Sequence, residues 1–181
     1  NTGEIVFFDR SWYTRALVEA TMGYCTKRQY TYFMKNVIPW EKKQIEEGVE
    51  FFKFYLSIEK NTQQKRIDKR ATSPLVYWKI SENDLKMLDK WDAFTLYKEQ
   101  MFKRTSYDEA PWIVLNANNK KVAILSALRF ILNAFDYPDK DLPKPKIWSE
   151  GLNNYKVEIN KVLFENLSYQ QYKTLRVFAD E

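Results

Sequence analysis

The stretch that decides the fold reads IVFFDRSWYTR and covers residues 5–15. Four apolar residues in a row at 5–8, two of them aromatic, predict a strand that is buried on both faces of a parallel sheet. The run ends at Asp9, and the polar and apolar residues that follow alternate at helical spacing. A carboxylate at the carboxyl end of a buried strand lies where open α/β sheets bind their ligands.

Asp9 allows two interpretations. An aspartate that ends a hydrophobic strand is typical of the Walker B pattern, in which the carboxylate holds Mg²⁺ for phosphoryl transfer. The simpler interpretation is that Asp9 or Ser11 caps the helix that follows, since both residue types commonly begin helices. The stretch taken alone does not decide between a metal ligand and a helix cap.

The composition narrows the classes of protein. With 181 residues, of which 45% are hydrophobic and 17% aromatic, the chain is long enough for one folded core. No apolar run is long enough to cross a membrane, and the single cysteine, Cys25, fits a reducing, cytoplasmic location. Because the chain has no histidine, a structural zinc site and a Ser-His-Asp triad are excluded, and any metal should be a hard cation bound by oxygen. The net charge of +5 indicates an anionic partner such as nucleic acid, a nucleotide or another phosphate polymer.

Helix and strand signals alternate along the chain. A helix is expected at 11–22, ending at Gly23, and a second begins at the capping box of Thr26 and Gln29 and is interrupted at Pro39. The further elements are strands at 49–58 and 111–115 and helices at 61–71, 81–104 and 120–135. The helix at 81–104 opens with a second capping box, formed by Ser81 and Asp84. This order predicts an α/β fold in three layers with a parallel sheet at residues 1–137, followed by a proline-containing linker and tail at 138–181.

The opening strand needs neighbours on both sides, yet it follows Asn1 almost at once. We therefore expect the sequence to be the later part of a longer domain. None of the four glycines belongs to a Gly-x-x-x-x-Gly-Lys-Ser/Thr phosphate loop. In P-loop proteins that loop follows the first strand, ahead of the Walker B strand, which is where an upstream segment would lie.

Residues 60–105 include a basic segment. Lys65, Arg66, Lys69 and Arg70 lie at i, i+4 spacings, so each pair presents its charges on one helical face. Either this is a solvated helix face, or it is a mobile basic lid that closes over phosphates and excludes water.

Asp92 lies at helical spacing from three leucines, Leu85, Leu88 and Leu96. A carboxylate within an apolar stripe is costly to bury without a partner. The pattern therefore predicts an arginine, a metal or a substrate hydroxyl close to Asp92, and a structural salt bridge is the alternative.

Several separated motifs occur in a fixed order. They are residues 3–15 with Val18-Glu19 and 22–26, then Ser73-Pro74-Leu75, Trp78-Lys79, Leu88-Asp89-Lys90-Trp91-Asp92, Lys98-Glu99-Gln100-Met101-Phe102, Arg104-Thr105, Ala110-Pro111-Trp112 and residues 116–121. Together they resemble the family-2 polyphosphate kinases over about residues 3–135. Thr14 departs from the family pattern, which usually has Asn at this position.

The resemblance implies a P-loop kinase-like parallel sheet with a helical lid at about 60–105, whose N-terminal strand and phosphate loop are missing from this chain. It implies Mg²⁺ as cofactor and a homo-oligomer without membrane association. The implied partners are inorganic polyphosphate, a nucleoside mono- or diphosphate, and ATP or GTP.

The resemblance also implies roles for individual residues. Asp9 is expected to bind the metal, and Asp9, Arg10 and Arg70 are expected to be catalytic. The further candidates for substrate binding are Arg15, Arg66, Lys79, Asp92 and Arg104, and Asn118 and Lys120 are the candidates for nucleotide binding.

The expected function is reversible, Mg²⁺-dependent phosphoryl transfer between polyphosphate and a nucleotide. Two alternatives stay open. One is a non-catalytic domain that binds polyphosphate or nucleic acid, and the other is an ATP-dependent nucleoside monophosphate kinase.

Overall fold

The computed structural model describes residues 3–140 and the backbone of 175–178. Its sheet has three parallel strands, β1 (Lys53–Ser57), β2 (Trp112–Asn116) and β3 (Leu175–Phe178), in the order β1-β2-β3. The prediction of an α/β fold with a parallel sheet is confirmed. Of the expected linker and tail, residues 141–174 and 179–181 lie outside the described part of the chain.

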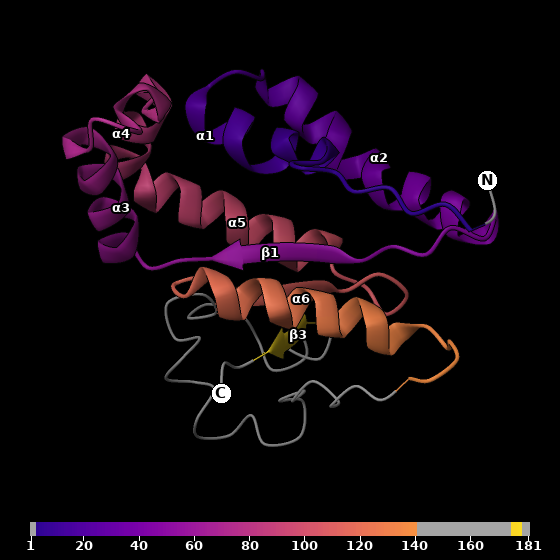
Figure 1. The fold of residues 1–181 in the computed structure, drawn as a ribbon. Helices are drawn as coiled ribbons and strands as arrows, with labels where there is room; N and C mark the ends of the chain where they lie inside the picture. The colour runs from indigo at the N-terminus through magenta and orange to yellow at the C-terminus, as the bar shows by residue number, and fades with distance from the viewer. Residues whose placement is uncertain (1–2, 141–174, 179–181) are drawn as a thin grey trace, which may run out of the picture.

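Helices cover both faces of this sheet (Figure 1). The helical elements are η1 (Trp12–Thr14), η2 (Arg15–Glu19), α1 (Ala20–Met22), α2 (Lys27–Glu46), α3 (Lys60–Thr72), η3 (Tyr77–Lys79), α4 (Glu82–Asp89), α5 (Trp91–Thr105) and α6 (Lys120–Ala134). The helix expected at 11–22 is present, although its backbone passes through 3-10, π and α geometry in turn. It ends as predicted at Gly23, whose φ of 78° is the left-handed conformation that glycine adopts without strain.

The core has two parts because the side chains of β2 alternate between the faces of the sheet. Trp112 and Val114 pack against η1, η2, α2 and α5 in the larger cluster. Ile113 and Leu115 pack against Phe130 of α6 in the smaller one.

Residues 5–8 do not form the predicted strand. They are assigned no regular structure, and their side chains are between 62% and 76% exposed. A strand requires a hydrogen-bonded neighbour, and none of the strands in the described residues pairs with this segment. The prediction of a strand buried on both faces is therefore wrong for residues 5–8 in this chain, although their side chains are apolar.

Two helix boundaries also differ from the prediction. Pro39 does not interrupt its helix, since α2 continues through it, and Val37 and Glu41 on either side of the proline are buried against the core. The helix expected at 81–104 is divided at Lys90, which ends α4 and begins α5. The Lys90 ammonium donates to the carbonyl of Thr21 at 3.2 Å, which fixes the break against the end of α1.

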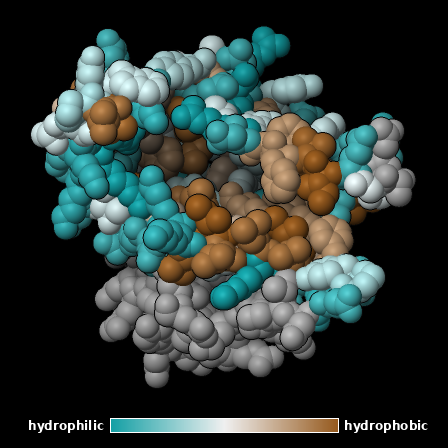
Figure 2. Space-filling model, viewed as in Figure 1, coloured by the Kyte–Doolittle hydropathy of each residue, from teal (hydrophilic) through white to brown (hydrophobic). Residues whose placement is uncertain are grey.

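The apolar stripe of α6 is largely exposed. Ala123 and Phe130 face the sheet, whereas Ile124, Leu125, Leu128, Leu132 and Phe135 are 39% to 59% exposed. Figure 2 shows apolar side chains gathered across the middle of this face of the molecule.

Candidate functional site

Asp9 and Arg10 lie in a bend between the extended segment and η1, and both are exposed. Arg10 has a φ of 61°, a left-handed conformation that is rare and strained for a residue with a Cβ. The helix cap is Ser11, whose hydroxyl accepts a hydrogen bond from the Tyr13 amide at 3.3 Å. Within the described residues, Asp9 makes no hydrogen bond or ion pair, so its carboxylate is not used as a cap.

Aromatic side chains on either side of this bend pack against each other. The ring of Phe8, which precedes Asp9, meets the ring of Trp12 edge-on at a centroid distance of 5.4 Å. Trp12 in turn packs against Trp40 of α2 at 4.8 Å and Phe51 at 5.9 Å. Trp12 therefore connects the residue before Asp9 to α2 and Phe51.

Thr14 ends η1 and Arg15 begins η2. The Arg15 guanidinium pairs with Glu19 one turn later. The Thr14 hydroxyl donates to the Ser11 carbonyl at 2.9 Å and is used within its own turn. Thr14 therefore makes a local backbone contact at the position where the family pattern has Asn.

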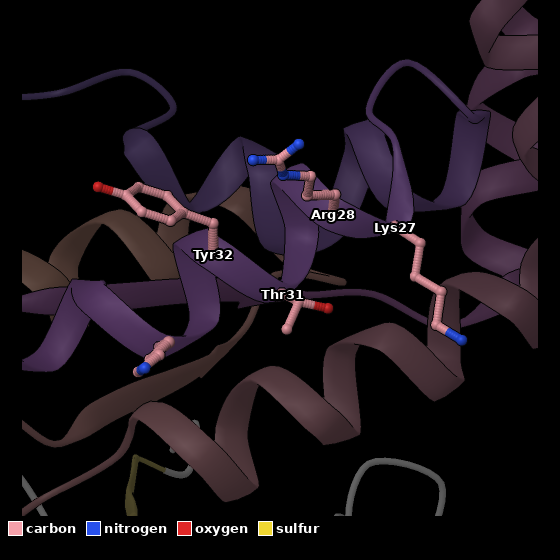
Figure 3. Close-up of a pocket in the computed structure, with 5 residues that line it drawn as sticks. Lys27, Arg28, Thr31 and Tyr32 are labelled. Carbon is pink, nitrogen blue, oxygen red and sulfur yellow. The ribbon is translucent and has the colours of Figure 1, made fainter.

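Two surface hollows lie along α2, and the larger one adjoins this segment. A groove of about 680 Å³ lies between residues 11–19 and α2, and Arg15, Arg28 and Trp40 are among its lining residues. A shallower hollow of about 490 Å³ on α2 is lined by Lys27, Arg28, Thr31, Tyr32 and Lys35 (Figure 3). Arg28 and Tyr32 belong to both hollows, so the two hollows are continuous.

Arg66 and Asn118, expected as separate binding residues, are brought together. Arg66 Nη2 donates to the carbonyl oxygens of Ala117 at 2.6 Å and Asn118 at 2.9 Å. The Asn118 side chain accepts from the Glu59 amide at 3.1 Å and donates to the Glu59 carboxylate at 3.2 Å. These contacts join the loops that follow β1 and β2, at the carboxyl ends of both strands.

Arg70 connects two helices beside this loop pair. Its Nη1 lies 3.6 Å from Asp84 Oδ2 on α4, and its Nε donates to the Arg66 carbonyl at 3.4 Å. Asp84 also completes the predicted capping box with Ser81. The helices α3 and α4 lie beyond the carboxyl end of β1 (Figure 1).

The remaining candidates lie on the surface. Lys79 is exposed with its ammonium 5.0 Å from the ring of Trp78, and Arg104 and Lys120 are exposed on α5 and at the start of α6. The structure does not bring Asp9 or Arg10 into hydrogen-bond or ion-pair contact with Arg66 or Arg70 in its described residues.

The expectation that Asp92 is buried in an apolar stripe is wrong. Asp92 is exposed in the first turn of α5, and Leu85 and Leu96 are also more than half exposed. The break at Lys90 separates the two halves of the predicted stripe, and α5 instead packs through the face that carries Met101 and Phe102.

The sequence analysis missed a buried ion pair beside Trp12. Glu41 of α2 and Lys53 of β1 lie 3.0 Å apart, with side-chain exposures of 0% and 5%. Burial lowers the pKa of Lys53, and the neighbouring Glu41 opposes that shift. The signal that could have found Lys53 is a lysine flanked on both sides by phenylalanine inside the strand run at 49–58.

The fold and site define an α/β protein with arginines near the carboxyl ends of its parallel strands. At its strained bend lies an exposed carboxylate that has no partner among the residues the structure describes. The profile of the polyphosphate kinase 2 family matches residues 1–143. The chain belongs to this family.

Individual relatives agree with this assignment. The chain is 43% identical over 154 residues to polyphosphate kinase PPK2B of Corynebacterium glutamicum, covering 82% of this chain and 50% of that protein. It is 45% identical over 139 residues to a GDP-polyphosphate phosphotransferase of Pseudomonas aeruginosa, covering 77% and 39%. The crystal structure of polyphosphate kinase 2 from Arthrobacter aurescens TC1 superposes with a TM-score of 0.66 at 30% identity, covering 75% and 50%. The chain thus spans half or less of the length of these relatives.

No cluster of three or more acidic, histidine or cysteine side chains that could hold a metal occurs among the described residues. A single exposed carboxylate such as Asp9 still suits Mg²⁺, which keeps several waters and is commonly bound by one or two carboxylates together with substrate phosphates. Among the helices of the described part of the chain, none is long and apolar enough to span a bilayer.

Proposed function

We propose that this chain is the later part of a Mg²⁺-dependent phosphotransferase that moves phosphoryl groups between inorganic polyphosphate and a nucleotide. The observation that carries the proposal is Asp9, an exposed carboxylate without a partner among the described residues, held in a strained bend directly after the apolar segment. The names of the relatives, which include GDP-, NDP- and ADP-polyphosphate phosphotransferases, support polyphosphate and nucleotides as substrates.

In the proposed reaction, an oxygen of the nucleotide's terminal phosphate attacks the terminal phosphorus of polyphosphate in line. The bond from that phosphorus to the bridging oxygen breaks, and a chain shorter by one phosphate leaves. Mg²⁺ bound at Asp9 would neutralise charge on the phosphates. Arg10 and Arg15 would bind phosphate oxygens, and Arg70 would stabilise the charge on the transferred group.

Arg66 and Asn118 receive a modified role. Because Arg66 is already bonded to two loop carbonyls, we propose that it shapes the loop after β2. Asn118 and Lys120 would then present that loop to the nucleotide. Lys79, Asp92 and Arg104 are exposed and stay candidates for contacts with substrate.

The finer fold proposal concerns the outer edge of β1. β1 has no partner on its outer edge among the described strands, and Leu56 on this strand is 60% exposed. We propose that a further parallel strand, followed by the phosphate-binding loop, pairs with β1 and with residues 5–8 in the complete protein. Both apolar surfaces would then become buried, as the sequence pattern at 5–8 predicts.

A coupled assay on the complete protein tests this function. The assay measures ATP or GTP formed from ADP or GDP with polyphosphate and Mg²⁺. Formation that requires polyphosphate supports the proposal. Transfer to AMP or GMP from ATP without polyphosphate would instead show a nucleoside monophosphate kinase, and binding of polyphosphate without any product would show a binding domain.

A further inference from the structure

Glu41 is the centre of a buried polar network. Its Oε2 accepts hydrogen bonds from Lys53 Nζ at 3.0 Å and from the Tyr107 hydroxyl at 2.9 Å. Its Oε1 accepts from Trp12 Nε1 at 3.2 Å. Both carboxylate oxygens are therefore used, and the residue is fully buried.

Lys53 makes the further contacts of this network. Its ammonium donates to the Thr105 carbonyl at 2.7 Å and lies 3.5 Å from the Tyr13 hydroxyl. It also lies 4.5 Å from the centre of the Tyr107 ring, within the range of a cation–π contact. The network thus joins η1, α2, β1 and the end of α5.

Such a pair is not required for a stable core. Replacing a buried ion pair by apolar residues of similar volume is often neutral or stabilising, because the attraction must offset the loss of hydration of both charges. What an apolar pair does not reproduce is the directional hydrogen bond that the Trp12 indole N–H donates to Glu41. This bond is the single hydrogen bond of the Trp12 side chain within the described residues.

We propose that Glu41 is a positioning residue that fixes Trp12, and through it the bend that carries Asp9 and Arg10. Trp12 is three residues after Asp9, and its ring contacts Phe8 on the other side of the bend. The ring alone could rotate or slide between Phe8 and Trp40, and the bond to Glu41 removes that freedom. This inference rests on the proposed phosphotransferase function, in which Asp9 would hold Mg²⁺ and Arg10 would bind phosphate oxygens.

Two matched variants test it in the complete protein. Trp12→Phe and Tyr107→Phe each remove one hydrogen bond to Glu41, but only Trp12 belongs to the bend. A double variant, E41L/K53M, removes the acceptor while it leaves Trp12 in place and no charge buried alone. The readouts are kcat and KM for nucleotide and polyphosphate, and the hydrogen-exchange rates of the amides at 9–17.

We expect Trp12→Phe and E41L/K53M each to lower kcat by about tenfold or more, because small displacements of reacting groups cost large factors in rate. The KM values should stay within about threefold of those of the wild type. The amides at 9–17 should exchange faster in both. Tyr107→Phe should keep kcat within about twofold and leave the exchange rates of these amides unchanged. This should hold even if the substitution lowers the thermal unfolding midpoint.

The proposal is overturned if Trp12→Phe keeps the wild-type kcat and exchange rates, or if Tyr107→Phe lowers kcat as much as Trp12→Phe does. If E41L/K53M does not fold, the single variants decide by these same criteria. If the wild-type protein transfers no phosphate, the proposed function has failed, and the exchange rates at 9–17 alone decide whether Glu41 fixes the bend.

Discussion

Arg70 Nη1 lies 3.6 Å from Asp84 Oδ2, so the arginine proposed to reach the transferred phosphoryl group is paired with a carboxylate of the neighbouring helix. About a third of each side chain is exposed. Pairs of this kind contribute only about 0–1 kcal/mol because solvent screens them. A phosphate with more than one negative charge can therefore displace Asp84 from Arg70.

This relationship predicts opposite effects of two substitutions. Asp84→Asn should change the KM for polyphosphate by no more than about fivefold, downward, since it removes only a weak competitor for Arg70. Arg70→Ala should lower kcat by about a thousandfold, as loss of an arginine does in other phosphoryl transfers. Steady-state kinetics of both variants provide the test, and an effect of Arg70→Ala confined to KM would reduce Arg70 to a binding residue.

Arg66 should act mainly on stability. Its two hydrogen bonds to the loop after β2 are charge-assisted and partly buried, so Arg66→Ala should lower the free energy of unfolding by about 2 kcal/mol. The neighbouring Lys65→Ala, an exposed site on the same helix, should change it by less than about 0.5 kcal/mol. Urea unfolding of both variants measures this difference, and equal values would contradict the anchoring role.

Phe7 should be buried in the complete protein. It is 76% exposed here, but the proposed neighbouring strand would cover it. Phe7→Asp should therefore destabilise the complete protein by about 2–4 kcal/mol, because it would bury a charge without a partner. The control is Tyr77→Asp at a residue that is 62% exposed in η3. If thermal unfolding shows the same small effect for both, residues 5–8 are not an inner strand.

The buried pair predicts a particular pH dependence. Burial lowers the pKa of Lys53 in the folded state from its ordinary value of 10.5. At a pH between the lowered pKa and 10.5, Lys53 therefore holds a proton in the unfolded chain that it has lost in the folded chain. Folded-state stability should therefore rise with pH in this window, by no more than about 1.4 kcal/mol per pH unit for one proton.

E41L/K53M is the reference for this measurement because it has no ionisable group at either position. The difference in free energy of unfolding between the wild type and this variant should shift in favour of the wild type as the pH rises toward about 10. Burial also raises the pKa of Tyr13 and Tyr107, which lowers stability above the ordinary tyrosine value of 10.0, so the scan ends there. A constant difference across the range would contradict a lowered pKa of Lys53.

Features that depend on a few adjacent residues were predictable from the sequence. The capping boxes at Thr26 and Ser81 and the helix end at Gly23 are formed as expected. The parallel sheet was predictable too, since β1 and β2 are apolar runs separated by helices. For the capping boxes, the helix end and each single strand, the signal and the structure that it predicts lie within the same short stretch.

Features that depend on distant contacts were not predictable. Pro39 stays helical because both of its flanks pack on the core, and burial at 5–8 needs a strand that is not among the described ones. In the site, Arg66 and Asn118 are 52 residues apart in the chain, and Trp12 and Glu41 are 29 apart. No local sequence pattern indicates that two residues so far apart in the chain form a contact. The sequence therefore did not predict these pairs.

The most direct test of the phosphotransferase proposal is the Asp9→Asn variant of the complete protein. The measurement is the rate of ATP formation from ADP and polyphosphate over a range of Mg²⁺ concentrations, with the thermal unfolding midpoint as the control for folding. We predict a loss of about 100-fold or more in kcat at every Mg²⁺ concentration with an unchanged midpoint, because Asn keeps the shape of the side chain but not its charge. Turnover close to that of the wild type would contradict the role of Asp9 and with it the proposed site.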